Sequence, residues 1–98
     1  MAKPKSKSIL SNEPCCYICG NAYYHDVHHI YGGGNRPVSD TNGFWVYVCR
    51  RCHTYANYSI HKDPDHKWDL GLKQRCQREY EKTHTRDEFI RKIGRSYL

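Results

Sequence analysis

The sequence lacks any long apolar run. Across its 98 residues, no stretch approaches the roughly 20 consecutive apolar residues that a membrane-spanning helix requires. Residues 1–14 also lack an apolar segment long enough for the centre of a secretory signal peptide. No internal repeat or low-complexity stretch is present. We therefore expect a cytoplasmic protein with no membrane partner.

The sequence is also poor in residues that build a large core. Hydrophobic residues make up 38% of the chain and charged residues 27%, and nine tyrosines stand against two phenylalanines. A chain this short forms at most one domain and buries too little surface to be stable without a staple. Six cysteines are available for disulfides or for metal ligation. Because cytoplasmic thiols stay reduced, Cys-x2-Cys pairs indicate zinc rather than disulfides.

Acidic residues are in the minority. Lys and Arg number 16 against 10 Asp and Glu, which gives a formal net charge of +6 and a pI near 9.1. Such a balance attracts polyanions, of which nucleic acid is the commonest. Excess positive charge also serves solubility, so charge alone does not decide between these readings.

Two segments have the composition of β-strands. Ala22 to Ile30 is rich in Tyr, Val, Ile and His, and Phe44 to Val48 contains only β-branched and aromatic residues. We expect them to pair as an antiparallel hairpin with a long connection, in which Gly32 to Pro37 is a loop and Asn42-Gly43 a turn. No Gly-Lys-Ser/Thr follows the three glycines, which excludes a P-loop. A hinge, or a backbone surface close to a ligand, is expected there instead.

Three helices are expected after the hairpin. The first spans Cys52 to His61, and the second runs from about residue 65 to about Lys82. Thr85-Arg86-Asp87-Glu88 is a capping box that opens the third helix, which ends at Gly94. The apolar side chains expected to be buried are Trp68, Leu72, Cys76 and Tyr80 in the second helix, and Phe89, Ile90 and Ile93 in the third.

The chain therefore divides into a tail and one α+β domain. Residues 1–13 carry three lysines among Pro, Ser and Ala, with too little apolar surface to offset the entropy of ordering, so a disordered basic tail is expected. Residues 14–98 form the domain, with a core at about 15–62 and C-terminal helices at about 65–95.

The cysteine spacing predicts a closed metal site. Cys16, Cys19, Cys49 and Cys52 form two Cys-x2-Cys pairs separated by the length of the hairpin. Four thiolates around Zn²⁺ are typical of a structural site. The rival arrangement replaces one of them by Cys15 or by a histidine.

Histidines adjoin both halves of this predicted site. His28 and His29 are neighbours on a strand and point to opposite faces, so they should have different roles. One can bind a metal together with His53, while the other can take a proton from water. The alternative is that the pair are ordinary strand residues and that His53 is the fourth zinc ligand.

Cys-x2-Cys, Val-His-His-Ile, an Asn and Cys-x2-Cys-His follow one another over residues 16–61. In this order they resemble the zinc-clamped branch of the HNH endonuclease family, whose fold is called ββα-metal or His-Me finger. The stretches His-His-Ile-Tyr-Gly-Gly-Gly-Asn-Arg, Tyr-Ser-Ile-His and Ile-Gly-Arg-Ser-Tyr-Leu are similar to small phage-encoded members. The resemblance implies metal-dependent hydrolysis of DNA phosphodiester bonds by a zinc-stapled ββα-metal core with C-terminal helices.

The resemblance also implies a catalytic metal site. His28 and His53 would be its ligands, and His61 and Asn57 on the same helix stripe compete for a further position. Many family members carry Asp where this chain has His28. The additional nitrogen ligand tilts the preference from strict Mg²⁺ toward Mn²⁺, Ni²⁺ or Zn²⁺.

Three further roles remain to be assigned: the general base, the middle asparagine and the phosphate contacts. The resemblance makes His29 the general base, and Asn42 and Asn35 compete for the middle asparagine of the family pattern. Turn chemistry alone also accounts for Asn42. The rival class of protein is a non-catalytic zinc module that binds DNA or protein. The candidate phosphate contacts, which in the alternative are a solvated basic face, are Arg36, Arg50 and Arg51.

Overall fold

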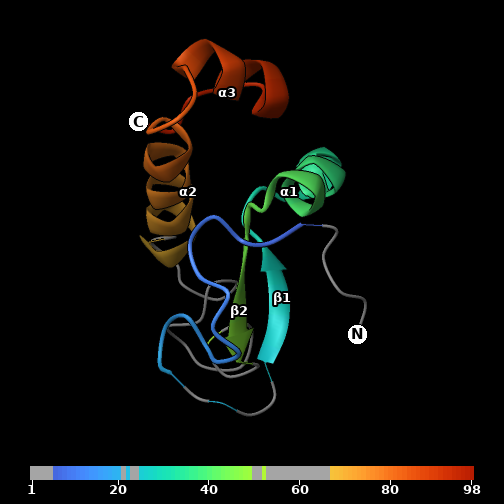
Figure 1. The fold of residues 1–98 in the computed structure, drawn as a ribbon, viewed down its shortest axis with the longest axis vertical. Coiled ribbons are helices and arrows are strands. Elements are labelled where there is room, and N and C mark those ends of the chain that lie inside the picture. The colour runs from blue at the N-terminus through green and yellow to red at the C-terminus, as the bar shows by residue number, and fades with distance from the viewer. Residues whose placement is uncertain (1–5, 21, 23–24, 50–51, 53–66) are drawn as a thin grey trace.

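A computed structural model of the chain describes residues 6–20, 22, 25–49, 52 and 67–98. In chain order its elements are β1 (His25–His29), a 3-10 helix η1 (Gly33–Asn35), α1 (Arg36–Asn42), β2 (Trp45–Cys49), α2 (Lys67–Tyr80) and α3 (Arg86–Ile93). Figure 1 shows α2 beside the two strands, α1 at one end of them and α3 beyond that end. The expected α+β class, with a hairpin and C-terminal helices, is confirmed. Beyond Cys52, the helix expected to reach His61 lies outside the described residues.

The two strands form the expected antiparallel hairpin. Their register runs from His25 opposite Cys49 to His29 opposite Trp45. Side chains alternate between the two faces of a strand, and residues directly opposite each other share a face. His28 therefore shares a face with its fully buried partner Val46, while His29 lies on the other face with Trp45.

The connection between the strands is helical rather than a loop and a turn. Pro37 stands in the first turn of α1, where its missing N–H is not needed. Gly43 ends α1 with a φ of 75°, and its N–H donates to the Ser39 carbonyl. The Asn-Gly pair thus marks a helix end, because glycine adopts the left-handed conformation that such an end requires. The expectation of a loop over residues 32–37 and a turn at Asn42-Gly43 is corrected accordingly.

Residues 6–13 pack on the domain, which differs from the disordered tail expected for residues 1–13. Buried Ser8 donates from Oγ to the Trp45 carbonyl at 2.6 Å, and the Ile9 N–H donates to the Gly43 carbonyl at 3.0 Å. The Trp45 indole donates to the Ser6 carbonyl at 2.9 Å. Hydrogen bonds hold this segment together with the packing of Ile9 and Leu10 against the core. The hydrogen bonds depend on distant partners that the composition of the segment does not reveal. Residues 1–5 lie outside the described part of the chain.

An aromatic cluster joins the hairpin to the C-terminal helices. The Tyr31 ring meets those of Phe44 and Phe89 edge to face, at centroid distances of 5.5 and 5.3 Å. Phe44 in turn meets Tyr80 of α2 at 5.5 Å. Such pairs each contribute about 0.5–1.5 kcal/mol beyond the area they bury. The cluster therefore fixes both helices against the ends of the strands.

The two C-terminal helices differ from expectation at single positions. Leu72, Cys76 and Tyr80 are buried as expected, whereas Trp68 is 38% exposed. The capping box of α3 is present, with both Thr85–Glu88 hydrogen bonds, and Gly94 ends the helix. In α3, Phe89 and Ile93 are buried, and Ile90 is 36% exposed because it lies about 100° around the helix from Phe89. Among the described residues, no helix is long and apolar enough to cross a membrane.

Candidate metal centre and histidine pair

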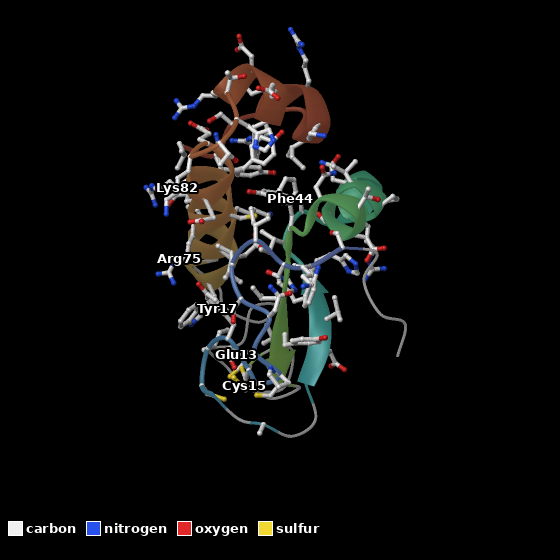
Figure 2. The ribbon with its side chains drawn as sticks, viewed as in Figure 1. Glu13, Cys15, Tyr17, Phe44, Arg75 and Lys82 are labelled. Atoms are coloured by element: carbon white, nitrogen blue, oxygen red, sulfur yellow. The ribbon has the colours of Figure 1, made fainter. Side chains whose placement is uncertain are left out.

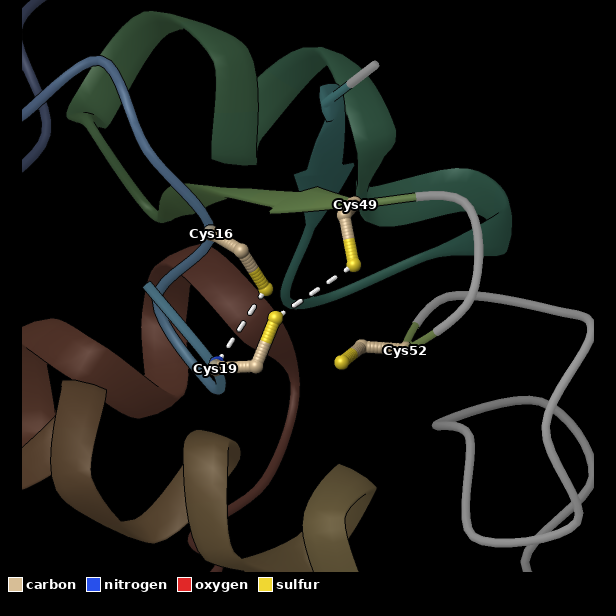
Figure 3. Close-up of side chains that lie close together, drawn as sticks. All are labelled: Cys16, Cys19, Cys49 and Cys52. Carbon is tan, nitrogen blue, oxygen red and sulfur yellow. Dashed lines mark hydrogen bonds between the residues drawn. The ribbon is translucent and has the colours of Figure 1, made fainter. Parts of the chain in front are cut away.

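Four cysteines meet at one end of the hairpin. The sulfur atoms of Cys16, Cys19, Cys49 and Cys52 all lie within 4.8 Å of one another, and Figure 3 shows them pointing toward a common centre. The Cys19 and Cys49 sulfurs are 3.6 Å apart. Tetrahedral zinc with bonds of about 2.3 Å requires sulfur separations of about 3.8 Å. The group therefore fits a zinc ion, in agreement with the predicted ligands.

Local hydrogen bonds shape the first half of this site. The backbone N–H groups of Ile18 and Cys19 both donate to the Cys16 sulfur at 3.4 Å, which favours a thiolate there. The Tyr17 N–H donates to the Tyr47 carbonyl at 2.7 Å. This bond attaches the Cys16–Cys19 turn to β2, whose last residue is Cys49.

The pKa values of two of these thiols shift in opposite directions. Burial raises the pKa of Cys16, but N–H donors from Cys19, Cys49 and Ile18 outweigh it, and the pKa falls from 9.0 to about 7. Burial, together with the neighbouring thiols, raises the pKa of Cys52. The lowered pKa of Cys16 favours metal ligation by its thiolate, whereas a metal bound by Cys52 would have to displace the proton of that thiol.

The other two cysteines lie elsewhere. Cys15 is half-buried, and its sulfur is not part of the four-sulfur group. Cys76 is fully buried in the core on α2, where burial raises the pKa of its thiol to about 12. The assignment of Cys16 rather than Cys15 to the metal group is therefore confirmed.

His29 contacts a carboxylate that the sequence analysis did not assign. Its Nε2 lies 3.2 Å from Oδ1 of Asp40 on α1, with side chains 19% and 21% exposed. A carboxylate only accepts hydrogen bonds, so the contact places a hydrogen on Nε2 and leaves the lone pair of the neutral ring on Nδ1. The pair can thus present Nδ1 as a proton acceptor of fixed orientation.

Ser39 holds α1 in the position that creates this pair. Its hydroxyl is fully buried, donates to the Tyr31 carbonyl at 2.8 Å and accepts from the Tyr31 N–H at 3.3 Å. Tyr31 follows β1 closely, so these two bonds anchor the residue beside Asp40 to the end of the strand. Sequence reasoning missed Asp40 because the helix that presents it was expected to be a loop and a turn. The only indication of Asp40 in the sequence was that a carboxylate follows the glycine-rich stretch 32–34 closely.

The two candidate asparagines make contacts with backbone carbonyls. Asn35 donates from Nδ2 to the Ile93 carbonyl at the end of α3, and Asn42 donates to the Val38 carbonyl within α1, both at 2.8 Å. Each side chain thus has a structural contact, and which of them assists His29 stays a prediction. Arg36 is exposed at the start of α1.

His28 is buried, with 5% of its surface exposed, on the opposite strand face from His29. The two histidines thus occupy different environments, as their adjacent strand positions require. The remaining candidates, which lie outside the described residues, are His53, Asn57, His61, Arg50 and Arg51.

Comparison with protein-family models, curated proteins and solved structures found no match to this chain. What the chain itself provides is a small α+β fold, a two-stranded antiparallel hairpin and a four-cysteine group able to hold a metal ion such as zinc.

Proposed function

We propose that this protein is a metal-dependent endonuclease of the HNH type, which hydrolyses DNA phosphodiester bonds. The observation that carries the proposal is the His29–Asp40 pair, in which a histidine on a cysteine-stapled hairpin is oriented by a carboxylate at 3.2 Å. The order of the cysteine and histidine motifs and the basic composition of the chain support the same function.

In the proposed mechanism, His29 accepts a proton from the attacking water at Nδ1. Asp40 accepts the Nε2 hydrogen, holds the ring in one tautomer and stabilises the positive charge that develops on the imidazole. The resulting hydroxide forms the new P–O bond in line with the departing 3′ oxygen. Breaking the P–O3′ bond leaves a 5′-phosphate, and the departing 3′ oxygen takes a proton from solvent water to become a 3′-hydroxyl end.

Two metals have different places in this proposal. Zinc fits the four-cysteine group and is structural there, since four protein ligands leave no open position. A catalytic Mg²⁺, Mn²⁺, Ni²⁺ or Zn²⁺, when bound, would supply stabilisation of charge on the phosphate oxygens. His28 would hold it together with His53 and with His61 or Asn57, all three outside the described residues.

The other roles are assigned within the same proposal. Asn42 or Asn35 would assist the base. Arg36, Arg50 and Arg51 would contact phosphates, which positions the DNA without reading its sequence.

A zinc-stabilised module that binds DNA or protein without cleaving it is the second candidate. The closed four-cysteine group favours it, because such a site needs no catalytic partner. The two candidates differ in metal stoichiometry: the module needs one metal per chain and the nuclease needs two.

A plasmid-cleavage assay separates these functions. The zinc-loaded protein would be incubated with supercoiled DNA in EDTA, or with added Mn²⁺, Ni²⁺ or Mg²⁺, beside the His29→Ala variant. Nicked or linear product that requires added metal and His29 is the expected result. No cleavage by the wild type with any metal, and one bound metal per chain at saturation, would contradict the nuclease.

A further inference from the structure

One exposed face of α2 carries an aromatic ring followed by positive charge. Its members are spaced three or four residues apart, which places them on one side of a helix and of the turn that follows it. All of them are exposed, and Figure 2 shows Arg75 and Lys82 pointing outward from α2, away from the strands. This α2 stripe consists of Trp68, Gly71, Arg75, Arg78 and Lys82.

A hollow lies at the tryptophan end of the stripe. Its volume is about 340 Å³, and it is lined by Tyr17, Trp68, Gly71, Leu72 and Arg75. Gly71 keeps it open, because a Cβ built there meets nothing within 4 Å. Two aromatic side chains and a guanidinium therefore surround a space next to the zinc-site turn, where Tyr17 resides.

Arg75 is fixed at the edge of this hollow. Its Nη1 donates to the Tyr17 hydroxyl at 3.0 Å, and its guanidinium carbon lies 5.9 Å from the centre of the Tyr17 ring. A hydroxyl partner does not neutralise the guanidinium, and among the described residues no ion pair involves Arg75. By contrast, Lys73 pairs with Asp69 at 2.8 Å. Lys82 contacts Glu79 at 2.9 Å, but this pair is largely exposed and weak, so a phosphate can compete for the lysine.

We propose that the α2 stripe binds single-stranded nucleic acid, with one unpaired base in the hollow. The base would stack on Trp68, and the phosphates that follow would lie along Arg75, Arg78 and Lys82. Aromatic platforms combined with arginine and a positive groove are the chemistry by which single strands are held. The inference rests on the proposed action on DNA and adds a surface separate from Arg36 on α1.

The first test compares strands with and without bases. Fluorescence anisotropy would measure binding of the zinc-loaded protein to an oligothymidine of about 15 nucleotides and to an abasic strand of equal length. The protein carries one zinc per chain, in the four-cysteine group, and no further divalent metal is added, so the proposed catalytic metal site stays empty and the strand is not cleaved. Trp68→Ala should weaken binding of the oligothymidine about tenfold and leave the abasic strand unchanged. The matched control is Leu70→Ala, which removes another exposed apolar side chain of α2, and it should change neither.

A second variant tests the hollow without removing any group. Gly71→Leu should fill the space and weaken oligothymidine binding about as much as Trp68→Ala, whereas the smaller Gly71→Ala should retain more affinity. Thermal melts of both variants verify folding, which the open space around Gly71 permits.

The charged part of the stripe has its own readout. Arg78→Ala should weaken binding of both strands and reduce the slope of log affinity against log salt by about one. Arg91→Ala removes an exposed cation from α3 and should leave the slope unchanged.

Three results would overturn the inference: equal effects of Trp68→Ala on the two strands, unchanged binding in Gly71→Leu, or equally strong competition by an acidic peptide. The last outcome would identify a protein-binding surface instead. Because these measurements need no catalysis, they are unaffected if plasmid cleavage fails. If the wild type cleaves plasmid DNA but every variant binds the strands as the wild type does, the proposed role of the α2 stripe is wrong and the proposed nuclease function is unaffected.

Discussion

His29 on β1 and Asp40 on α1 meet through a 3.2 Å contact between Nε2 and Oδ1, although eleven positions separate them in the chain. The short helix α1 creates this contact, since it turns the connection of the hairpin back toward the strand. A histidine that serves as a base works best when its tautomer and ring orientation are set in advance. The proposed role of His29 as the base thus depends on α1, a helix that the sequence did not predict.

Asp40→Asn should lower the cleavage rate by about 10²–10⁴ while preserving the fold. The amide can donate to Nε2 and so favours the opposite tautomer, with the hydrogen on Nδ1. Nitrogen-15 NMR of labelled histidine would detect that change directly, whether or not the protein cleaves DNA. Asp87→Asn makes the same substitution on the exposed start of α3 and should alter neither readout. An unchanged His29 tautomer in Asp40→Asn would contradict the positioning role.

His29→Ala should reduce cleavage by about 10²–10⁴ without loss of zinc or of DNA binding, because only the proton acceptor is removed. His28→Ala or His53→Ala should instead lower occupancy of a second metal and spare the zinc. Metal analysis and cleavage rates would separate these effects. His84→Ala, which removes an exposed histidine after α2, is the control and should cleave normally. A fully active His29→Ala variant would show that His29 is not the general base.

The sequence patterns with short-range physical causes predicted their elements well. The β-branched and aromatic run ending at Val48 forms β2, and the Thr85–Glu88 capping box opens α3. The Cys-x2-Cys spacing located the metal group because ligand geometry restricts which thiols can converge. In each case the signal lies in short stretches of sequence: a strand, a capping box or a Cys-x2-Cys pair.

Features that depend on long-range contacts were not predictable in this way. Ser8 is buried, and its hydroxyl donates to the carbonyl of Trp45, 37 positions away. Nothing in the sequence around Ser8 indicates that bond. Asp40 becomes a partner of His29 only once Ser39 has docked α1 on the strand end. Trp68 continues an apolar helix pattern but lies exposed at the beginning of α2.

Cys19→Ser or Cys52→Ser should unfold the domain rather than only inactivate it. The core is small, and binding of a structural zinc contributes directly to folding. Thermal unfolding followed by circular dichroism would measure the effect. Cys15→Ser is the control, since its sulfur lies outside the metal group, and it should melt close to the wild type. A cooperative transition near the wild-type temperature in either ligand variant would contradict the four-cysteine assignment.

Zinc affinity should fall as the pH is lowered, and more steeply below pH 7 than above it. Cys16, with a pKa of about 7, is largely a thiolate at pH 8 but must release a proton to zinc at pH 6. Because the pKa of Cys16 is lower in the folded protein than its ordinary value of 9.0, the thiolate stabilises the fold at pH values above 9.0. This contribution is lost as the pH falls through 7. Competition with a chromophoric chelator at pH 6, 7 and 8 would measure the affinity. An affinity independent of pH would argue against thiolate ligands.

Gly43→Ala tests the packing of the N-terminal segment. The φ of 75° alone should cost about 1–2 kcal/mol for alanine, and a Cβ there would also overlap the Lys7 carbonyl. Relief of that overlap requires residues 6–13 to move, which would stretch the hydrogen bond from Ile9 to Gly43.

Gly94→Ala is the matched control for this substitution. Its φ is 105°, and a Cβ at that position meets nothing within 4 Å. It therefore carries backbone strain without the steric overlap. Chemical denaturation of both variants would measure the two free energies of unfolding, and Gly43→Ala should be the less stable of the two. Equal losses would argue against packing of residues 6–13 on Gly43, because the overlap with the Lys7 carbonyl is absent at Gly94.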